Sequence, residues 1–249
     1  MAYEKGLILI PARYGSHRLP GKALADISGK TMIRRTYERC KLTDMHVMVV
    51  TDDKRIVDEC LTHSIPVDIV TEECKTGTDR VAICAERNSQ ADWIINVQGD
   101  EPFANPDDIL RVARQMENGD HREVVNGMSR ITNKDDLFSV TIPKVIAWDG
   151  LLKYMSRAPV PYPYGPSEDL WKRSAMQQVC IYGFFRHHLE KFLEQTEKTN
   201  YESIEDIEIL RFHEMGIPVR MLELEGSPLH VDTPADLERA QLIAKDYDA

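Results

Sequence analysis

The sequence lacks the cysteine pattern and the long apolar runs that mark several protein classes. Its five cysteines are odd in number and show no C-x-x-C spacing, which argues against a disulfide framework and against a zinc site. We interpret them as small apolar side chains in a reducing compartment. The first apolar run, residues 6–10, is far shorter than a membrane span and lacks a secretory cleavage pattern. We therefore predict a cytoplasmic protein that does not bind membranes.

Basic residues are in the minority. The chain has 31 lysines and arginines against 41 aspartates and glutamates, which gives a formal net charge of −10 at pH 7. A protein with this balance has no overall basic surface for nucleic acids or anionic membranes. An anionic substrate must therefore be bound by a local basic pocket. The length of 249 residues allows one large domain or a domain with an insertion.

Two familiar phosphate-binding motifs are also missing. No G-x-G-x-x-G follows a predicted strand, and the segment from Gly15 to Gly21 has one residue too many for a P-loop. Lys22 is followed by Ala23 rather than by a hydroxyl residue that could contact magnesium. The common mononucleotide and dinucleotide loops are therefore excluded.

The chain instead has a basic loop of its own between Ile10 and Lys22. This loop holds three cationic residues and two glycines in thirteen residues. It follows the buried strand predicted over 6–10, so we expect it at the carboxyl edge of a sheet, where α/β proteins bind ligands. Backbone N–H groups can approach a polyphosphate there, while arginine and lysine neutralise its charge. The alternative is a solvated loop with incidental basic residues.

Strands and helices alternate along most of the sequence. Apolar patterns predict strands at 6–10, 46–51, 67–70, 92–97 and 219–224, and helices at 32–40, 53–61, 76–86, 106–116, 202–216 and 235–244. This alternation predicts an α/β fold with a mostly parallel, doubly wound sheet and helices on both faces. In the middle third, residues 123–131, 139–148 and 177–185 have strand patterns without full helices between them. Residues 156–166 are rich in proline, which excludes regular structure there.

One polar motif, Thr76-Gly77-Thr78-Asp79-Arg80, opens a predicted helix. Either threonine could cap that helix. In the functional interpretation, Gly77 lets a base or ribose lie close to the backbone, while Arg80 and the helix N-terminus face phosphate. The residues alone leave both interpretations open.

Two aspartates occupy junctions between predicted elements. Asp100 follows a buried strand, where a carboxylate can hold Mg²⁺ against phosphate oxygens. It could equally be a turn residue that bonds its own backbone. Asp232 precedes Thr233 and Pro234, an arrangement typical of a helix N-cap.

Taken together, these motifs resemble one enzyme family. The basic loop follows the pattern P-A-R-x-x-S-x-R-[LF]-P-G-K of the cytidylyltransferases that activate 3-deoxy-manno-octulosonate (Kdo). T-G-T-D-R, N-V-Q-G-D-E-P, S-R-A-P-V-P and V-D-T-P-A-D-L then follow in family order, at 76–80, 96–102, 156–161 and 231–237. The resemblance implies a Rossmann-like nucleotidyltransferase domain over residues 1–249. It also implies a smaller β-rich insertion at about 124–185 through which the family forms homodimers.

The resemblance further implies a reaction and a set of site residues. CTP and a 2-keto-3-deoxy sugar acid would give the CMP-sugar and pyrophosphate, with Mg²⁺ as cofactor, for lipopolysaccharide biosynthesis. The implied catalytic residues are Arg13, Lys22, Asp100 and Asp232, of which the two aspartates would bind Mg²⁺. The implied nucleotide-binding residues are Pro11, Ala12, Arg13, Ser16, Arg18, Lys22, Gly77, Thr78, Arg80 and Gln98. The implied acceptor-binding residues are Gln98, Arg157, Gln178, Tyr182, Glu205 and Asp206.

The acceptor half departs from the family pattern. R-H-x-G-[IV]-Y becomes residues 177–182, with Gln178 in place of a histidine, although Tyr182 is retained. E-x-L-E-Q-L-R becomes residues 202–208, with Asp206 and Glu208 in place of a glutamine and an arginine. Carboxylates in a pocket favour an ammonium or hydroxyl groups. We therefore hypothesise that the acceptor is an aminated Kdo, a nonulosonic acid or a phosphonate; alternatively, at least one of the two carboxylates faces solvent.

Two other functions fit parts of the sequence. Nucleotidyltransferases that use UTP, GTP or TTP on sugar 1-phosphates have a similar loop, but their G-x-G-x-R opening is missing here and Q-G-D-E-P is present. The base itself cannot be derived from motif spacing. A non-enzymatic nucleotide-binding protein with a degenerate site would have lost loop cations or carboxylates, whereas this sequence keeps Arg13, Lys22, Asp100 and Asp232.

Overall fold

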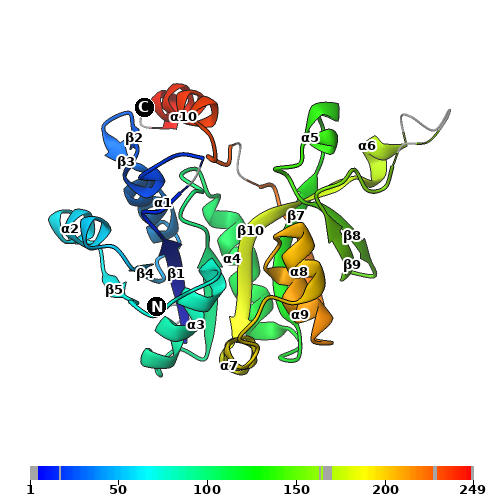
Figure 1. Cartoon of the computed structure of the whole chain (residues 1–249), viewed down its shortest axis with the longest axis horizontal. Coiled ribbons are helices and arrows are strands. Elements are labelled where there is room, and N and C mark those ends of the chain that lie inside the picture. Colours follow the sequence, from blue (N-terminus) through cyan, green and yellow to red (C-terminus); the bar gives the residue numbers. More distant parts are fainter. Residues whose placement is uncertain (1–4, 17, 163, 165–169, 227–228, 248–249) are drawn as a thin grey trace.

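A nine-stranded sheet forms the centre of the molecule (Figure 1). The computed structural model describes residues 5–16, 18–162, 164, 170–226 and 229–247. The strand order is β5-β4-β1-β6-β10-β7-β11-β9-β8, and β2 pairs with β3 in a separate two-stranded sheet. The strands are β1 (Gly6–Ala12), β2 (Asp26–Ile27), β3 (Lys30–Thr31), β4 (His46–Thr51), β5 (Val67–Ile69), β6 (Trp93–Val97), β7 (Val124–Arg130), β8 (Lys144–Trp148), β9 (Leu151–Ser156), β10 (Met176–Phe185) and β11 (Val219–Glu223).

Helices connect the strands and pack on the sheet. They are the 3-10 helix η1 (Lys22–Leu24), α1 (Met32–Lys41), α2 (Lys54–Thr62), α3 (Gly77–Arg87), α4 (Pro106–Asn118), α5 (Lys134–Phe138), α6 (Trp171–Ser174), α7 (Arg186–Glu194), α8 (Asn200–Glu205), α9 (Ile209–Glu214) and α10 (Pro234–Tyr247). No helix among the described residues combines the length and apolarity that crossing a membrane requires.

The sheet is mixed, but most of its strands run in the same direction. β1 is parallel to β4 and β6, β4 is parallel to β5, and β7 is parallel to β11. β10 is antiparallel to β6 and β7, and β9 is antiparallel to β11 and β8. Among the described strands of this sheet, β9 and β10 therefore run against the others. The predicted α/β fold class is confirmed.

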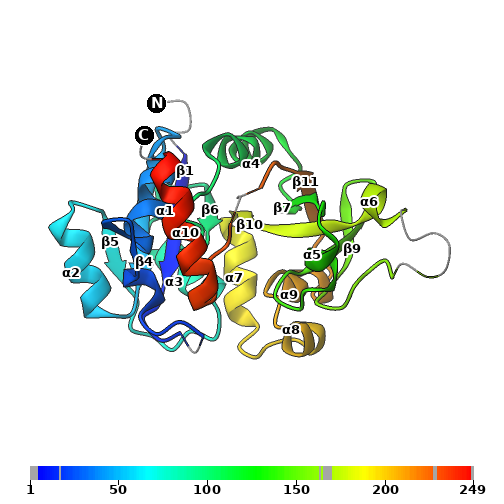
Figure 2. The same cartoon turned by 90° about the horizontal axis from the view of Figure 1, so that it is seen from above.

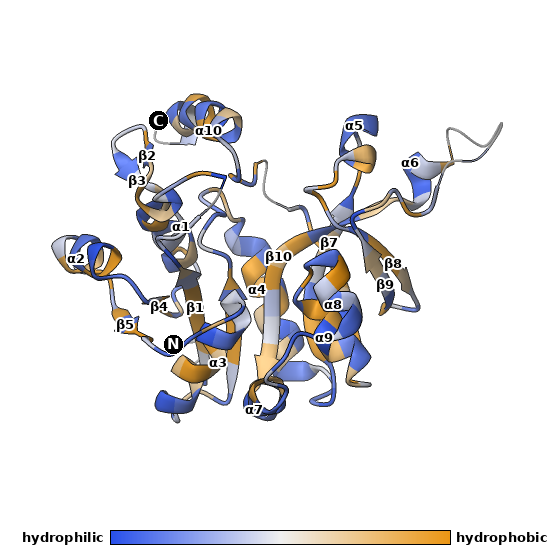
Figure 3. Ribbon diagram, in the orientation of Figure 1, coloured by the Kyte–Doolittle hydropathy of each residue, from blue (hydrophilic) through white to orange (hydrophobic). Residues whose placement is uncertain are grey.

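The two faces of the sheet are covered by different helices. Leu7 and Leu9 of β1 pack into a core with α3, α7 and α9, whereas Ile8 and Ile10 pack into a second core with α1, α2 and α4. This follows from the period of two in a strand, which sends neighbouring side chains to opposite faces. Figure 2 shows α3, α7, α8 and α9 on one side of the strands and α4 on the other. In Figure 3, β1 is coloured largely as apolar, whereas α2, on the outside, shows both apolar and hydrophilic residues.

The prediction of one helix over 202–216 is wrong, because the chain forms α8 and α9 instead. Between them Asp206 has φ 52°, the left-handed region that aspartate tolerates better than most residues. The guanidinium of Arg157 donates to the carbonyl oxygens of Glu205 and Asp206. These contacts satisfy carbonyl groups that the end of a helix leaves without partners.

The region 124–185 contains further elements that the sequence pattern does not predict. The predicted strand 139–148 begins only at Lys144, after the short helix α5, and β9 and α6 follow it. After β10 comes α7, which is also not predicted, although Leu189 and Phe192 lie at helical spacing. Residues 157–162 have no helix or strand, as expected. The remainder of the proline-rich segment at 163, 165 and 166, like His17 of the basic loop, lies outside the described residues.

A buried arginine joins three helices on one side of the sheet. Arg211 of α9 is 1% exposed. Its guanidinium donates to both carboxylate oxygens of Glu202 in α8, at 2.7 Å each, and to Asp79 Oδ1 in α3 at 3.1 Å. Asp79 Oδ2 accepts hydrogen bonds from the backbone N–H and the hydroxyl of Thr76, the N-cap of α3. The start of α3 is therefore fixed to α8 and α9.

We expect Arg211→Ala to destabilise the protein by about 3–5 kcal/mol, because Glu202 and Asp79 would remain buried without their cation. Urea denaturation followed by circular dichroism measures the loss. Arg122→Ala serves as the control, since Arg122 pairs with Asp120 on the surface, and its urea midpoint should not change. An equal loss in both variants, or none in Arg211→Ala, would contradict the structural role of the buried arginine.

Candidate active site

A cavity of about 500 Å³ lies at the carboxyl ends of β1 and β6. Its wall contains residues from the basic loop, the start of α3, the loop after β6, β10, the α8–α9 turn and the loop before α10. The predicted site residues that line it are Pro11, Ala12, Arg13, Ser16, Arg18, Lys22, Gly77, Arg80, Gln98, Asp100, Arg157, Gln178, Tyr182, Asp206 and Asp232. Thr78 and Glu205 are not among the residues that line the cavity.

Glycines allow the loops after β1 and β6 to approach each other. A Cβ on Gly99 would lie 2.7 Å from the carbonyl oxygen of Pro11, so a larger residue there would push the two loops apart. In the basic loop, Gly21 has φ 67°, a conformation that favours glycine. The next residue, Lys22, begins η1, and its backbone N–H donates to the carbonyl oxygen of Leu19. The lysine side chain is thereby placed close to Asp100.

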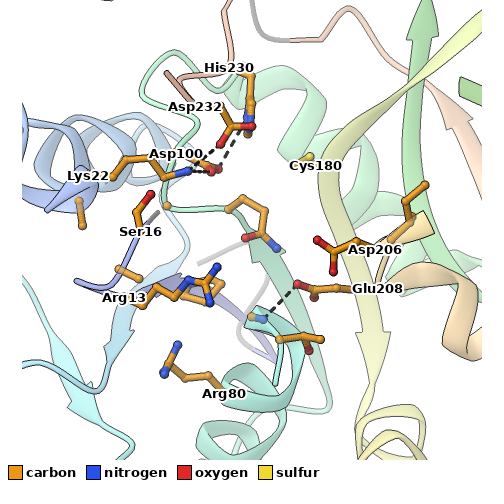
Figure 4. Close-up of a pocket in the computed structure, with 18 of the residues that line it drawn as sticks. Arg13, Ser16, Lys22, Arg80, Asp100, Cys180, Asp206, Glu208, His230 and Asp232 are labelled. Carbon is orange, nitrogen blue, oxygen red and sulfur yellow. Dashed lines mark hydrogen bonds and ion pairs between the residues drawn. The ribbon is translucent and has the colours of Figure 1, made fainter. Parts of the chain in front are cut away.

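Two carboxylates from distant parts of the sequence meet at Lys22 (Figure 4). Lys22 Nζ lies 2.5 Å from Asp100 Oδ2 and 3.0 Å from Asp232 Oδ1. The backbone N–H of Val231 donates to the carbonyl oxygen of Asp100 at 3.2 Å, so the two loops are also bonded directly. Arg18 lies 3.1 Å from Asp232 Oδ2. The aspartates and the loop cations therefore form one cluster.

Neither aspartate has the structural role that the sequence also allowed. At the start of α10 the Thr233 hydroxyl, not the Asp232 side chain, accepts from the Asp236 backbone N–H. Asp236 Oδ2 accepts in return from the hydroxyl and the backbone N–H of Thr233 and from the backbone N–H of Asp232. The Asp232 side chain is thus directed to Lys22. Asp100 Oδ1 is buried and has no hydrogen-bond partner among the described residues.

Charges around the carboxylates favour their ionised forms. Burial raises the pKa of Asp100, but His230 and Lys22 outweigh it and hold the pKa below its ordinary value. The pKa of Asp232 is also lowered, because the same two cations outweigh burial. Burial lowers the pKa of Lys22, whereas Asp100 and Asp232 raise it more. The cluster is therefore a set of mutually stabilising charges.

Sequence reasoning missed two residues of this cluster, His230 and Glu101. His230 Nε2 lies 3.2 Å from Asp232 Oδ2, and Nδ1 lies 3.2 Å from Glu101 Oε1. Burial disfavours the imidazolium, but Asp100, Asp232 and Glu101 raise the pKa of His230 well above its ordinary value. Their positions gave a signal, because each lies within two residues of a proposed metal carboxylate.

The nucleotide side of the cavity has cations from two elements. Arg13 extends into the cavity from the basic loop, and Arg80 lies on α3 (Figure 4). Arg80 Nη2 pairs with Asp52 Oδ2 at 2.5 Å, whereas its Nε is buried without a partner among the described residues. A triphosphate bound on this side would meet guanidinium groups from two different elements.

The start of α3 does not face the cavity in the predicted way. Thr76 caps the helix in a reciprocal capping box with Asp79, so the structural interpretation of Thr76 is correct. Glu208 accepts hydrogen bonds from the backbone N–H groups of Gly77 and Thr78, at 3.0 Å each, and from the Thr78 hydroxyl. Burial raises the pKa of Glu208, although these donors oppose the shift. The N-terminus of α3, which the functional interpretation placed against phosphate, therefore already binds a carboxylate of the protein.

Arg157 and Glu205 hold backbone and neighbouring side chains in place. Arg157 donates to the carbonyl oxygens of Glu205, Val140 and Asp206. Glu205 accepts from Ser156 Oγ at 2.8 Å and from the Arg157 backbone N–H at 2.8 Å. These contacts fix the end of β9 to the α8–α9 turn. Although Arg157 borders the cavity, its guanidinium nitrogens already have backbone partners.

Lys144, the first residue of β8, has a similar structural role. It is fully buried, and its ammonium donates to the carbonyl oxygens of Ser139, Ile142 and Arg157 at 2.6 Å each. Burial lowers its pKa. Lys144 therefore supports the loop before β8 and leaves no donor for a ligand.

The acceptor wall contains amide and phenol groups on β10. Gln178 Nε2 donates to Asn126 Oδ1 at 3.0 Å and to the Tyr182 hydroxyl at 3.3 Å. Asn126 in turn donates to the carbonyl oxygens of Val179 and Ile181, where the pairing register of β10 shifts. Asp206 is exposed, and its Oδ1 pairs with Lys198 at 2.6 Å. This half of the cavity thus presents polar groups that are already ordered by neighbours.

Comparisons with known proteins agree with this arrangement. The cytidylyltransferase family matches residues 7–221. A 3-deoxy-manno-octulosonate cytidylyltransferase from Alcanivorax borkumensis is 36% identical over 241 residues, which cover 93% of this chain and 95% of that protein. One from Christiangramia forsetii is 33% identical over 240 residues, 94% and 95% of the two chains.

Solved structures lead to the same family. A structure of CMP:2-keto-3-deoxy-manno-octonic acid synthetase complexed with CTP is 32% identical, with a TM-score of 0.87, and the match covers 98% of this chain and 99% of that one. A 4-diphosphocytidyl-2C-methyl-D-erythritol synthase from Anaerococcus prevotii, 15% identical with a TM-score of 0.62, shares the fold alone. Because the similarity extends over nearly the whole chain, the protein belongs to the family that includes 3-deoxy-manno-octulosonate cytidylyltransferase and is a CTP-dependent nucleotidyltransferase.

Proposed function

We propose that this enzyme transfers CMP from CTP to 3-deoxy-manno-octulosonate and releases pyrophosphate. The observation that supports this most directly is the meeting of Asp100 and Asp232 at Lys22, in contact with cations of the basic loop. Phosphoryl-transfer sites need carboxylates that can hold a metal ion beside cations that bind phosphate. The acceptor is the substrate named for the relatives at 33–36% identity. Because CTP is the other substrate, the proposal places the enzyme in the cytoplasm.

The side chains of the cavity act by alignment and charge neutralisation. Arg13, Lys22 and Arg80 bind the triphosphate, and Arg18 supports them. Held in this way, the α-phosphorus can be attacked in line by the acceptor hydroxyl. A bond forms between that hydroxyl oxygen and the α-phosphorus, the bond to the bridging oxygen of the β-phosphate breaks, and the hydroxyl proton passes to solvent. Gln98 is placed in the cavity wall where it can contact the acceptor.

Mg²⁺ is the cofactor that we propose, held by Asp100 and Asp232. Both residues offer the hard oxygen ligands that Mg²⁺ prefers. The buried Asp100 Oδ1, which has no hydrogen-bond partner among the described residues, fits an ion as well. When bound, Mg²⁺ neutralises phosphate charge and lowers the pKa of the attacking hydroxyl.

The contacts of Asp206 and Glu208, the two carboxylates that depart from the family pattern, favour Kdo over the modified acceptors. Asp206 has the ammonium of Lys198 as partner, and Glu208 accepts three hydrogen bonds at the start of α3. Neither carboxylate therefore requires an ammonium group on the acceptor. The hypothesis of an aminated Kdo, a nonulosonic acid or a phosphonate loses its main physical reason.

We also propose a homodimer formed through the region 124–185. Several large apolar side chains of this region are exposed: Trp148, Tyr162, Tyr164 and Leu170. Trp148 is 78% exposed, and aromatic residues of this kind are enriched in protein interfaces. A second copy of the chain would cover them.

We expect Asp100→Asn to lower kcat/KM by about 10²-fold or more, because the electrostatic contribution of one carboxylate to charge stabilisation is lost. Pyrophosphate release from CTP and Kdo measures the effect. Asp92→Asn is the matched control, since Asp92 pairs with Lys5 on the surface, and it should keep full activity. Circular dichroism checks that both variants fold. A folded and fully active Asp100→Asn enzyme would count against the mechanism.

The acceptor is tested by product mass and pyrophosphate release with a panel of acidic sugars. With CTP and Mg²⁺, we expect Kdo to give the highest kcat/KM among Kdo, an aminated Kdo, a nonulosonic acid and a phosphonate. UTP in place of CTP should lower kcat/KM by at least about 10²-fold, as expected when polar groups of a site select a base. Faster turnover of any other acceptor would overturn the assignment of Kdo.

Light scattering tests the dimer. We expect a mass of twice the 28.5 kDa of one chain, and we expect Trp148→Lys to shift the protein toward a monomer, because it places a charge in an apolar interface. Leu61→Lys, an exposed position on α2, is the control and should stay dimeric. A monomeric unmodified protein, or a Trp148→Lys variant as dimeric as the control, contradicts the proposed interface.

A further inference from the structure

The imidazole of His230 lies among three carboxylates that belong to two loops. It comes from the loop before α10, as does Asp232, whereas Asp100 and Glu101 follow β6. One ligand atom each from Asp100, His230 and Asp232 lie within 4.8 Å of one another, a spacing that a single metal ion can bridge. The histidine therefore stands beside the carboxylate pair to which the proposed function assigns Mg²⁺.

The two ring nitrogens have different partners. Nε2 lies 3.2 Å from Asp232 Oδ2, an oxygen of one of the two carboxylates assigned to the ion. Nδ1 lies 3.2 Å from Glu101 Oε1 and 3.7 Å from Asp100 Oδ1. Histidines that bind metals commonly donate the N–H of the other ring nitrogen to a carboxylate, which fixes the orientation of the ring. Glu101 and His230 already have this arrangement.

Buried oxygens without partners provide a second and independent observation. Glu101 is 5% exposed, and its Oε2 has no hydrogen-bond partner among the described residues. Asp100 Oδ1 is likewise buried and has no hydrogen-bond partner in that part of the chain; His230 Nδ1 faces it at 3.7 Å, beyond hydrogen-bond distance. Leaving such atoms unpaired is costly, so the cluster is suited to a further positive charge.

We propose that His230 is a third protein ligand of the metal ion, beside Asp100 and Asp232, with Glu101 as the residue that positions the ring. The inference rests on the proposed function, because it adds a ligand to the carboxylate pair assigned there. It implies a donor set of one nitrogen and two carboxylates. Ion binding at Nε2 releases the proton of that nitrogen to solvent.

A nitrogen ligand changes which ions the site prefers. Carboxylates suit Mg²⁺, whereas imidazole adds affinity for divalent first-row transition ions. The site should therefore bind Mn²⁺ more tightly than Mg²⁺, and part of that preference should come from His230. Lys22, whose ammonium contacts the same two aspartates, competes with the ion for those oxygens.

Pulsed electron paramagnetic resonance with Mn²⁺ as the probe tests the proposal on the intact protein. We expect ¹⁴N modulation from a directly bound imidazole. In His230→Gln the modulation should disappear and the Kd for Mn²⁺ should rise by about tenfold or more, since loss of even an outer-shell partner costs 10–100-fold. The Kd for Mg²⁺, measured by competition, should rise less.

Two further variants make the outcome specific. His63→Gln, at an exposed histidine that pairs with Glu59 on α2, should keep the modulation. Glu101→Gln should keep it as well but weaken Mn²⁺ binding, because only the ring support is altered. Bound Mn²⁺ without ¹⁴N modulation, or modulation that persists in His230→Gln, overturns the ligand role of His230 and leaves the carboxylate pair intact. Failure to bind Mn²⁺ at all overturns both the inference and the carboxylate metal site of the proposed function.

Discussion

The site depends on one interaction, the ammonium of Lys22 held between the carboxylates of Asp100 and Asp232. The two aspartates are far apart in the sequence, and without a cation between them their charges would repel each other at close range. The lysine comes from a loop whose arginines extend into the same cavity. A single contact therefore joins the proposed metal ligands to the proposed phosphate-binding loop. It places both beside the site where the proposed phosphoryl transfer takes place.

The fold provides this contact through the edge of a sheet. The basic loop and the loop with Asp100 follow the parallel strands β1 and β6, so they emerge side by side. Asp232 arrives from the far end of the chain, and the backbone bond from Val231 to the Asp100 carbonyl oxygen fixes its loop. On the opposite wall, the buried pairs of Arg211 hold the start of α3 against α8 and α9. The contacts that stabilise the fold therefore also fix the positions of the site residues.

Much of this could be predicted from the sequence, because motifs at strand ends are local. The alternation of apolar runs predicts most of the sheet and its helices, and the resemblance to the cytidylyltransferase family implies that Asp100 and Asp232 share a site with Lys22. What could not be predicted is which side chain meets which across long sequence separations. Glu208 was expected in an acceptor pocket, yet it binds backbone N–H groups 130 and 131 residues away. The helix interruption at Asp206 likewise involves Arg157, which is distant in the sequence. The role proposed for His230 follows only from its contact with Glu101 in the structure.

The central claim is that both aspartates bind one divalent ion facing the loop cations. Anomalous diffraction from a crystal grown with Mn²⁺ and CTP measures this most directly, because manganese can be located independently of the protein. The account predicts a peak within ligand distance of both Asp100 and Asp232, with the triphosphate between that ion and Arg13. A manganese peak that touches only one of the two carboxylates, or lies outside the cavity, would contradict it.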